Sequence, residues 1–338
     1  MQDNSKTQRN RRGMERVTMA DVARHAGVSA SSVSLFLRKP DAVSVRIAPR
    51  IAAAIEEMGY VPNLVAGGLA AAGSRVVSVI VPSLRNAFFS ETVTALERHL
   101  ARKGLQTLVG HTEYSLDQEE ALVRAALSWA PAAIVLTGGQ HTQRTRDLLR
   151  KTATPVVEMW ELPAEPIDRA VGFSHEQVGG EMARHFIACG YRRAAFLGAR
   201  LHEDTRADSR ARGFVSAMEA AGCEAFVTTE KAPASAATGA HLLDAVVAGR
   251  ARAVACSNDT VALGLLFEAQ RRGIAVPDTL AVAGFGDLDF AAHCVPTLTT
   301  IRPQADRIAA TVSRCILDQD HTERLYSIQF NLIVRGST

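Results

Sequence analysis

Two arginines, Arg206 and Arg210, follow a strongly apolar segment at 194–198 and lie four residues apart. A guanidinium group pairs with a carboxylate through two parallel hydrogen bonds, so two arginines in one loop suit an anionic ligand. Glu203, Asp204 and Asp208 offer an alternative, because surface ion pairs with them would also account for the arginines. The pattern predicts either an anion-binding loop or a solvated charged surface.

Motifs of nucleotide binding and covalent catalysis are missing from the sequence: it contains no GxGxxG, GxxxxGK[ST], GxSxG or HExxH. The ten histidines are scattered. The five cysteines form no CxxC pair, which argues against a disulfide framework and against a zinc site. We therefore expect no enzyme, no metal and no cofactor.

Length and composition fit a globular protein with several domains. The 338 residues suggest two to three domains, and 47% of them are apolar against 22% charged. No apolar run is long enough to cross a bilayer, and residues 1–16 are polar and basic without the apolar centre of a secretory signal. These features predict a cytoplasmic protein.

Charge is distributed unevenly along the chain. Residues 1–75 hold 11 Lys and Arg against 6 Asp and Glu, whereas the remainder holds 27 against 29. A basic head on a slightly acidic body favours a nucleic-acid-binding module attached to another domain. Residues 1–16 are expected to be a disordered arm, which either attracts DNA phosphates or only solubilises the chain.

Capping and turn residues then predict a helix-turn-helix. Thr18 is placed to cap a first helix, Gly27 to end it in the left-handed conformation, and Ser29 to cap a second helix. A third helix follows Ser44 and ends at Gly59. Two short helices around a glycine turn place the second one in a DNA major groove.

The stretch from VTMADVARHAGVSASSVSLFLRKP through GYVPNLVAGGLAAAGSRVVSVIVP resembles the head of the LacI family of bacterial transcription repressors, register for register. The resemblance implies that Ala30 and Ser31 read base edges and that Thr18, Ser29 and Ser32 contact phosphates. Leu35 stands where the family usually has an arginine. Leucine cannot grip a guanine bidentately, so either the operator differs at that base or Leu35 touches a thymine methyl.

The segment 61–74 resembles the family's hinge helix. The resemblance implies that Asn63 caps it and that Leu69 wedges between the central base pairs from the minor groove. Gly67 and Gly68 depart from the pattern, and each costs a helix about 1 kcal/mol relative to alanine. We expect this helix to form only on DNA, where two copies pack together.

Strand and helix patterns alternate through the rest of the chain. Apolar segments at 76–82, 105–110, 132–139, 155–159, 170–173, 194–198, 253–259, 280–287 and 326–334 read as strands. Helical patterns separate most of them, which predicts an α/β fold with parallel sheets in two series and ligands at the carboxyl ends of the strands. The body also resembles the LacI-family core, which is similar to periplasmic sugar-binding proteins.

The resemblance implies four regions. They are an arm at 1–16, a DNA-binding domain at 17–60, a hinge at 61–74 and an effector-binding and dimerisation core at 75–338. In the core, one lobe takes about 75–172 and 303–326 and the other about 173–301 and 327–338. The chain is expected to cross between lobes near 172–174, 300–303 and 325–327.

Within the family the body resembles the gluconate repressor branch, on the strings PSLRNAFFSE, HTQRT, AVGFSHE, LGARL and SNDTVALG. The resemblance implies an effector pocket lined by Ser83, Asn86, Phe88, Phe89, His141, Trp160, Glu161, Arg206, Arg210, Asn258 and Asp287. The aromatic rings would cover an apolar sugar face. Asp259 is expected to cap the helix after Asn258, and the glycine at 286 weakens the transfer to Asp287.

These observations predict a homodimeric repressor that binds double-stranded operator DNA and is released by a small sugar acid such as gluconate. A neutral sugar or a nucleobase is the alternative effector, and corepression is the alternative sign of control. A periplasmic-type solute-binding protein is a rival that the basic head argues against. An enzyme acting on sugar acids is a second rival, and it would need a catalytic constellation that the sequence lacks.

Overall fold

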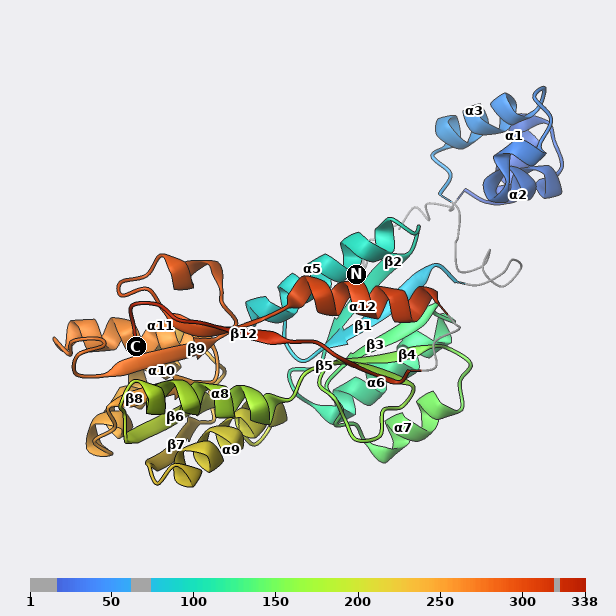
Figure 1. The fold of residues 1–338 in the computed structure, drawn as a ribbon. Helices are drawn as coiled ribbons and strands as arrows, with labels where there is room; N and C mark the ends of the chain where they lie inside the picture. The colour runs from blue at the N-terminus through green and yellow to red at the C-terminus, as the bar shows by residue number, and fades with distance from the viewer. Residues whose placement is uncertain (1–16, 62–73, 319–322) are drawn as a thin grey trace, which may run out of the picture. The chain divides into compact units, whose positions relative to one another are not determined.

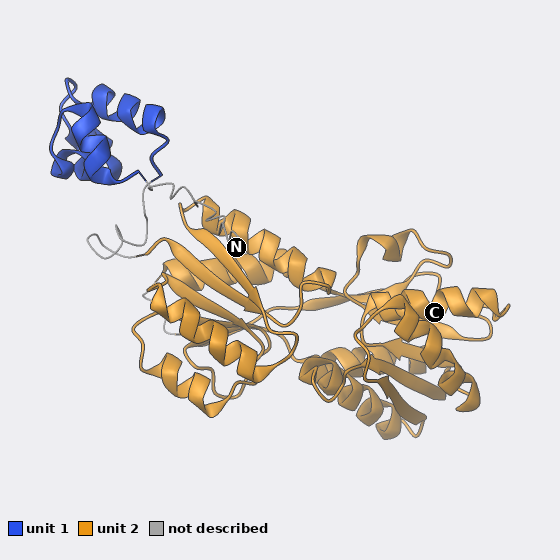
Figure 2. Ribbon diagram, turned by 180° about the vertical axis from the view of Figure 1, so that it is seen from behind, with its two compact units in different colours: residues 1–72 blue, residues 73–338 orange. Residues whose placement is uncertain are grey.

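The computed structural model describes residues 17–61, 74–318 and 323–338. The chain divides into two compact units, residues 1–72 and residues 73–338 (Figure 2). The expected basic arm and most of the expected hinge fall outside the described residues. The helices that the structure describes are all too short or too polar to cross a membrane.

Three helices make up the described part of the first unit: α1 (Met19–Ala26), α2 (Ala30–Arg38) and α3 (Ala48–Met58), with a 3₁₀ turn η1 at Pro40–Ala42. Thr18 and Asp21 form a reciprocal capping box at α1. Gly27 ends α1 at a φ of 62°, in the left-handed region that favours glycine. The turn brings Val22, Val33 and Ile51 together as a small apolar core.

The second unit contains two six-stranded sheets (Figure 1). The sheet of the first lobe has the order β11-β5-β4-β3-β1-β2 and is parallel throughout. Its strands are β1 (Val76–Val81), β2 (Gln106–His111), β3 (Ala133–Thr137), β4 (Val156–Trp160), β5 (Arg169–Gly172) and β11 (Leu325–Ser327).

The sheet of the second lobe has the order β12-β10-β9-β8-β6-β7, in which only the β10–β12 pairing is antiparallel. Its strands are β6 (Arg193–Ala199), β7 (Glu224–Glu230), β8 (Ala253–Cys256), β9 (Ala281–Phe285), β10 (Thr299–Pro303) and β12 (Phe330–Ile333). The predicted α/β class is confirmed. The sequence patterns missed β7 and β10 as strands and merged β11 with β12, although these two belong to different sheets.

Helices cover both faces of each sheet (Figure 1). In the first lobe α5 (Ala87–Ala101) and α12 (Ala305–Leu317) pack on one face, and α6 (Leu116–Ser128) and α7 (Gln143–Arg150) on the other. In the second lobe α8 (His175–Ala188) and α9 (Thr205–Ala220) oppose α10 (Ala236–Ala248) and α11 (Asp259–Arg271), and η2 (Asp289–Ala292) follows β9. Alternate residues of each strand therefore point into different apolar layers.

Helices α8 and α9 approach each other closely because two glycines face the partner backbone. A Cβ atom on Gly179 would lie 1.9 Å from the carbonyl oxygen of Arg210, and one on Gly213 would lie 2.1 Å from that of Glu176. No side chain fits in either place. This packing fixes the start of α9, from which Arg206 and Arg210 project.

Candidate functional site

The exposed face of α2 in the first unit carries short side chains at its first turns. Ala30, Ser31 and Leu35 are exposed, and Leu35 keeps 36% of its surface. Ser29 caps the helix: its hydroxyl accepts the Ser32 N–H at 3.2 Å and lies 2.8 Å from the hydroxyls of Ser31 and Ser32. Short side chains with hydroxyl and methyl groups therefore lie at the exposed surface of α2.

Thr18 is exposed, but its hydroxyl is already engaged. It donates to Asp21 Oδ2 at 2.5 Å, and these hydrogen bonds from Thr18 lower the pKa of the Asp21 carboxyl. A phosphate contact by Thr18 would have to share this oxygen. Two other predicted DNA-contacting residues, Asn63 and Leu69, lie outside the described residues.

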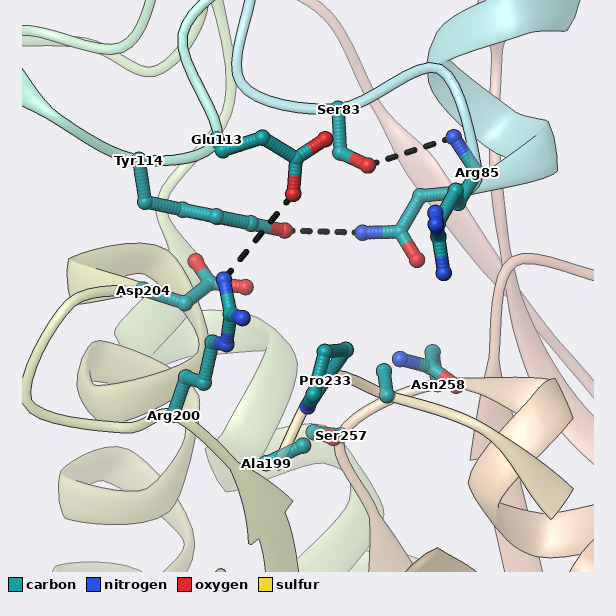
Figure 3. Close-up of a pocket in the computed structure, with 12 residues that line it drawn as sticks. Ser83, Arg85, Glu113, Tyr114, Ala199, Arg200, Asp204, Pro233, Ser257 and Asn258 are labelled. Carbon is teal, nitrogen blue, oxygen red and sulfur yellow. Dashed lines mark hydrogen bonds and ion pairs between the residues drawn. The ribbon is translucent and has the colours of Figure 1, made fainter. Parts of the chain in front are cut away.

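A polar cleft opens between the lobes of the second unit, at the carboxyl ends of β1, β6 and β8 (Figure 3). Three of the predicted residues, Ser83, Asn86 and Asn258, line it. The remaining lining residues are Arg85, Glu113 and Tyr114 from the first lobe and Ala199, Arg200, Asp204, Pro233, Ala234 and Ser257 from the second. This compartment is small, at about 20 Å³.

Tyr114 is one of the side chains that line this compartment. Its hydroxyl accepts a hydrogen bond from Asn86 at 2.8 Å, and Glu113 beside it pairs with Arg200 across the cleft at 3.9 Å (Figure 3). Burial, together with the charge of Asp204, raises the pKa of the Tyr114 phenol. Glu113 and Tyr114 both have positive φ, at 47° and 67°, and such strained backbone is typical of functional loops.

Tyr114 also lines a second, larger compartment of about 170 Å³. Arg206 lines this compartment rather than the smaller one, and so do Glu119, Thr137 and Gln140 of the first lobe. The other lining residues are Ile80, Val81, Pro82, Thr112, Ser115, Leu116, His202, Glu203 and Thr205. Tyr114 is thus the residue that the two lining sets share.

Arg210 is a buried cation without a carboxylate partner in the described part of the chain. Its guanidinium donates to Nδ1 of His175 and to the carbonyl oxygen of Ser257, both at 2.9 Å, and Nε makes no hydrogen bond. Its guanidinium carbon lies 4.1 Å from the ring centre of Phe285. Burial lowers the pKa of Arg210 to about 10, although the charge of Asp204 opposes this. Arg210 lines neither compartment, but a buried cation of this kind gains most from an anionic ligand.

His175 is one of the two hydrogen-bond acceptors of Arg210. Because Arg210 can only donate, Nδ1 of His175 must accept, and Nε2 donates to the carbonyl oxygen of Trp160 at 3.0 Å. Burial and then the charge of Arg210 lower the pKa of His175 well below its usual range, so the ring is neutral. His175 therefore accepts a hydrogen bond from Arg210 without adding a charge of its own.

Arg206 is paired more loosely. It lies 3.6 Å from Asp204 and 4.0 Å from Glu161, whose other contact is the Gly139 N–H at 3.1 Å. Both pairs are longer than a good hydrogen bond. Asp204 also caps α9 through the Ala207 N–H. Ion pairing with nearby carboxylates, the alternative to an anion-binding loop, therefore accounts for Arg206 in part. It does not account for Arg210.

The structure packs the residues of the predicted aromatic wall into the interior. Phe88, Phe89 and Trp160 are almost fully buried and pack on one another with centroid distances of 4.4 to 5.6 Å. Phe88 also contacts Phe285 of the second lobe at 5.6 Å. Burying four large rings together gains more than leaving them against solvent in a cleft, so they form a core between the lobes.

His141 is also predicted to face the cleft, but the structure buries it, and it lines neither compartment. Its ring lies between two carboxylates, 2.6 Å from Glu119 and 3.2 Å from Glu158. Burial alone would lower the pKa of His141, but these two hydrogen bonds raise it to about 9. The ring turns inward because the buried carboxylates need a cation.

Two predictions after β8 and β9 are corrected as well. Asn258, not Asp259, caps α11, through the Val261 N–H at 3.0 Å, and Asp259 is buried against Thr300. Asp287 pairs with Arg302 and Arg335 and lies outside both compartments. A carboxylate with two arginine partners has little reason to face a ligand.

Sequence reasoning missed Arg85, Glu113, Tyr114, Arg200 and Ser257 in the smaller compartment and Glu119, Gln140 and Thr205 in the larger one. A signal existed for several of them, because residues directly after β2 and β6 lie at the same sheet edge as the predicted set. Within the described ranges, no cluster of three His, Cys, Asp or Glu side chains could hold a metal ion.

A helix-turn-helix unit in the same chain as a two-sheet core with a polar cleft defines the class of DNA-binding transcription regulators that respond to small molecules. The comparisons agree with this class. A family model for bacterial regulatory proteins of the lacI family matches residues 18–63, and one for a periplasmic binding protein-like domain matches residues 183–338.

Full-length relatives extend the match. The HTH-type transcriptional regulator GntR of Pseudomonas aeruginosa is 36% identical over 99% of both chains. The structure of a LacI family regulator from Silicibacter pomeroyi shares 30% identity at a TM-score of 0.88, covering 95% of this chain and 99% of that one. The structure of the regulator GntR from Chromobacterium violaceum shares 37% identity at a TM-score of 0.73, covering 78% and 98%. The chain belongs to the LacI family, and the prediction of a DNA-binding regulator rather than an enzyme is confirmed.

Proposed function

We propose that this protein is a homodimeric repressor whose operator affinity falls when a sugar acid such as gluconate binds between the lobes of its core. The observation that carries the proposal is the pair of arginines on the first turns of α9: Arg206 lines the larger compartment, and Arg210, one turn further on, is a buried cation that has no carboxylate partner among the described residues. A neutral sugar would leave this charge without compensation, whereas a carboxylate would pair with its fork.

The polar cleft supports the rest of a sugar acid. Side-chain hydroxyl, amide and carboxylate groups line both compartments, and they match the hydroxyl groups of a sugar chain. The resemblance to the gluconate repressor branch and the regulators named GntR among the relatives point the same way. Binding would change operator affinity only if the two states of the core hold the acid unequally, and such coupling is typically 1–3 kcal/mol.

On the DNA side, we propose that Ala30, Ser31 and Leu35 face base edges in the major groove while Ser29 and Ser32 contact phosphates. Two copies related by a two-fold axis would read two half-sites of a near-palindromic operator. Asn63 and Leu69 would act in the minor groove at the centre of the site. The exposed methyl groups of Leu35 suit a thymine methyl better than a guanine edge.

The first experiment is a thermal-shift series on the full chain with gluconate, ketogluconates, gluconate 6-phosphate and neutral sugars, followed by calorimetry. A ligand at 100 times its dissociation constant should stabilise the protein by about 2.7 kcal/mol. Stabilisation by a sugar acid alone is the expected result. Stabilisation by neutral sugars or nucleobases alone would overturn the sugar-acid proposal.

The second experiment identifies the operator by selecting tight binders from a random duplex pool. Fluorescence anisotropy then measures the affinity for the selected duplex with and without the acid. We expect a near-palindromic site and a weaker complex when the acid is present. A tighter complex would show that the acid is a corepressor and would reverse the proposed sign of control.

A further inference from the structure

The larger compartment of the cleft has an unusual wall. Most of its polar groups are hydroxyls or amides, such as those of Thr112, Thr137, Gln140 and Thr205. One ionisable carboxylate from the first lobe, Glu119, joins them from the first turn of α6. A cavity of about 170 Å³ could hold several water molecules, so it has room for part of a ligand.

Glu119 is more than nine-tenths buried, because its side chain retains 8% of its surface. One of its oxygens, Oε1, lies 2.6 Å from Nδ1 of His141. The other oxygen, Oε2, makes no hydrogen bond with any residue that the structure describes. Because Glu119 lines the compartment, this second oxygen is an acceptor that protein groups leave unused.

The other carboxylate of the cluster contrasts with it. Glu158 uses both oxygens: Oε1 meets Nε2 of His141 at 3.2 Å, and Oε2 accepts the Ile167 N–H at 2.6 Å. His141 therefore bridges two carboxylates, of which one is satisfied inside the protein and one is half free. A buried ion cluster costs desolvation energy and is weak evidence for stability. A ligand that donates a hydrogen bond to the free oxygen of Glu119 would offset part of that cost.

We propose that Glu119 Oε2 accepts hydrogen bonds from hydroxyl groups of the effector and selects a hydroxylated chain at that end of the cleft. This inference rests on the proposed function, in which Arg206, which lines the same compartment as Glu119, and Arg210 hold the acid group. A carboxylate only accepts, so it suits hydroxyl donors. A phosphate ester at the same end carries no donors and is repelled by the carboxylate charge. His141 acts through Glu119, as a positioning residue that fixes its orientation.

The test compares wild type with Glu119→Gln, which keeps the size of the side chain and removes its charge. Calorimetry on the full chain measures gluconate and gluconate 6-phosphate. Gluconate affinity should fall about 10- to 100-fold, the range for a hydrogen bond to a charged group. Affinity for the phosphate ester should stay the same or rise. Unchanged affinity for gluconate in Glu119→Gln would overturn the inference.

Glu120 provides a matched control one residue along the same helix. It pairs with Arg124 and accepts from Thr142, and it lines neither compartment. Glu120→Gln should bind gluconate as wild type does. An equal loss in both variants would mean that the effect comes from helix α6 as a whole and would overturn the assignment to Glu119.

A double-mutant cycle tests the positioning role of His141. His141→Gln alone should weaken gluconate binding, but it should cause no further loss when added to Glu119→Gln, because the two residues act as one unit. Additive losses would overturn that role. If either variant fails to fold, the affinities of the wild type for gluconate and for hexanoate are compared instead. Hexanoate lacks hydroxyl groups and should bind at least 100-fold more weakly than gluconate. Equal binding of the two acids would overturn the inference.

The series separates the two proposals. Wild type that binds gluconate, with Glu119→Gln equal to it, overturns this inference and keeps the sugar-acid effector. Wild type that binds only neutral sugars overturns the sugar-acid effector, and the loss in Glu119→Gln is then measured with that sugar. Wild type that binds no ligand of the panel overturns both.

Discussion

The interiors of the two units differ in kind. In the first unit the described buried residues are all apolar, from Val22 to Ala54, and its polar groups stay at the surface. The second unit buries charged and titratable side chains, including Arg210, Glu158 and Asp259. A buried charge is costly unless it is paired, so such groups persist where a ligand or a moving part needs them.

This difference follows from where each unit meets its ligand. DNA stays outside the protein, so the first unit needs only a rigid frame that presents short side chains. Under the proposed function a small molecule enters the second unit between its lobes, so part of that interior must be polar and incompletely satisfied before the ligand arrives. The unpaired Nε of Arg210 and the free oxygen of Glu119 are the clearest cases.

The largest expected effect concerns the helix contact that places Arg210. In Gly213→Ala a new Cβ would lie 2.1 Å from the carbonyl oxygen of Glu176, so α8 and α9 must separate. We expect the free energy of unfolding to fall by about 3 kcal/mol or more, the upper range for overpacking. Both tryptophans belong to the second unit, so denaturant unfolding followed by tryptophan fluorescence reports on it.

Gly180→Ala is the control on α8. The nearest atom to its added Cβ is the end of the flexible Arg184 side chain at 3.2 Å, so the helix contact stays intact. Its stability should be unchanged or raised, because alanine favours a helix by about 1 kcal/mol over glycine. Equal losses in the two variants would mean that close packing of α8 on α9 is not the reason.

The second effect concerns the buried charge itself. Arg210→Met keeps the apolar stem and removes the cation, so affinity for the sugar acid should fall by about 100-fold, which corresponds to roughly 2.7 kcal/mol. The change in stability should be small, because removing a buried charge that has no carboxylate partner offsets the loss of its hydrogen bonds to His175 and Ser257. Calorimetry and unfolding measure the two quantities, and Arg212→Ala at the surface is the control.

A loss of stability in Arg210→Met, with unchanged ligand affinity, would contradict a ligand-binding role for this buried charge. Arg210 would then be a structural residue held by His175 and Ser257, and the anion site would have to be sought at Arg85 or Arg200. Operator affinity without ligand should match wild type in either case.

Local signals were enough to predict the first unit, and they predicted the cleft only in part. The caps at Thr18 and Ser29 and the glycine at 27 act within a few residues, so the sequence shows them directly. The fate of His141, Phe88 and Asp287 depends on partners that are far away in the chain. Whether a side chain faces a ligand or its own core is decided by those partners, and a single sequence does not reveal them.

Strand prediction failed for the same reason. β7 is an edge strand of mixed exposure, so its residues lack the apolar run that marks the central strands. β11 and β12 are consecutive in sequence but pair in different sheets, which a pattern of apolar residues does not distinguish. Tertiary pairing overrides local propensity at such edges.

The third effect is a pH dependence that only the second unit should show. The pKa of His141 in the folded protein is raised to about 9 from an ordinary value of 6.5. The stability it contributes is therefore complete below pH 6.5 and lost as the pH rises through 9. We expect a loss of about 2 kcal/mol between pH 7 and pH 9.5 in tryptophan-detected unfolding. His141→Gln should remove this slope, and a slope that persists in the variant would assign it to another group.

The smallest effect distinguishes two roles of Ser29 in the first unit, which are capping helix α2 and contacting a DNA phosphate. Ser29→Ala removes the N-cap of α2 and should lower the stability of this unit by about 1 kcal/mol, as measured by calorimetry, while the tryptophan-detected transition stays unchanged. Ser29→Asp should restore the stability, because aspartate caps a helix as well as serine does. It should still bind the selected operator more weakly than wild type, since a carboxylate beside a phosphate is repelled. If Ser29→Asp binds as wild type does, Ser29 contributes only to the frame and the phosphate contact lies elsewhere on α2.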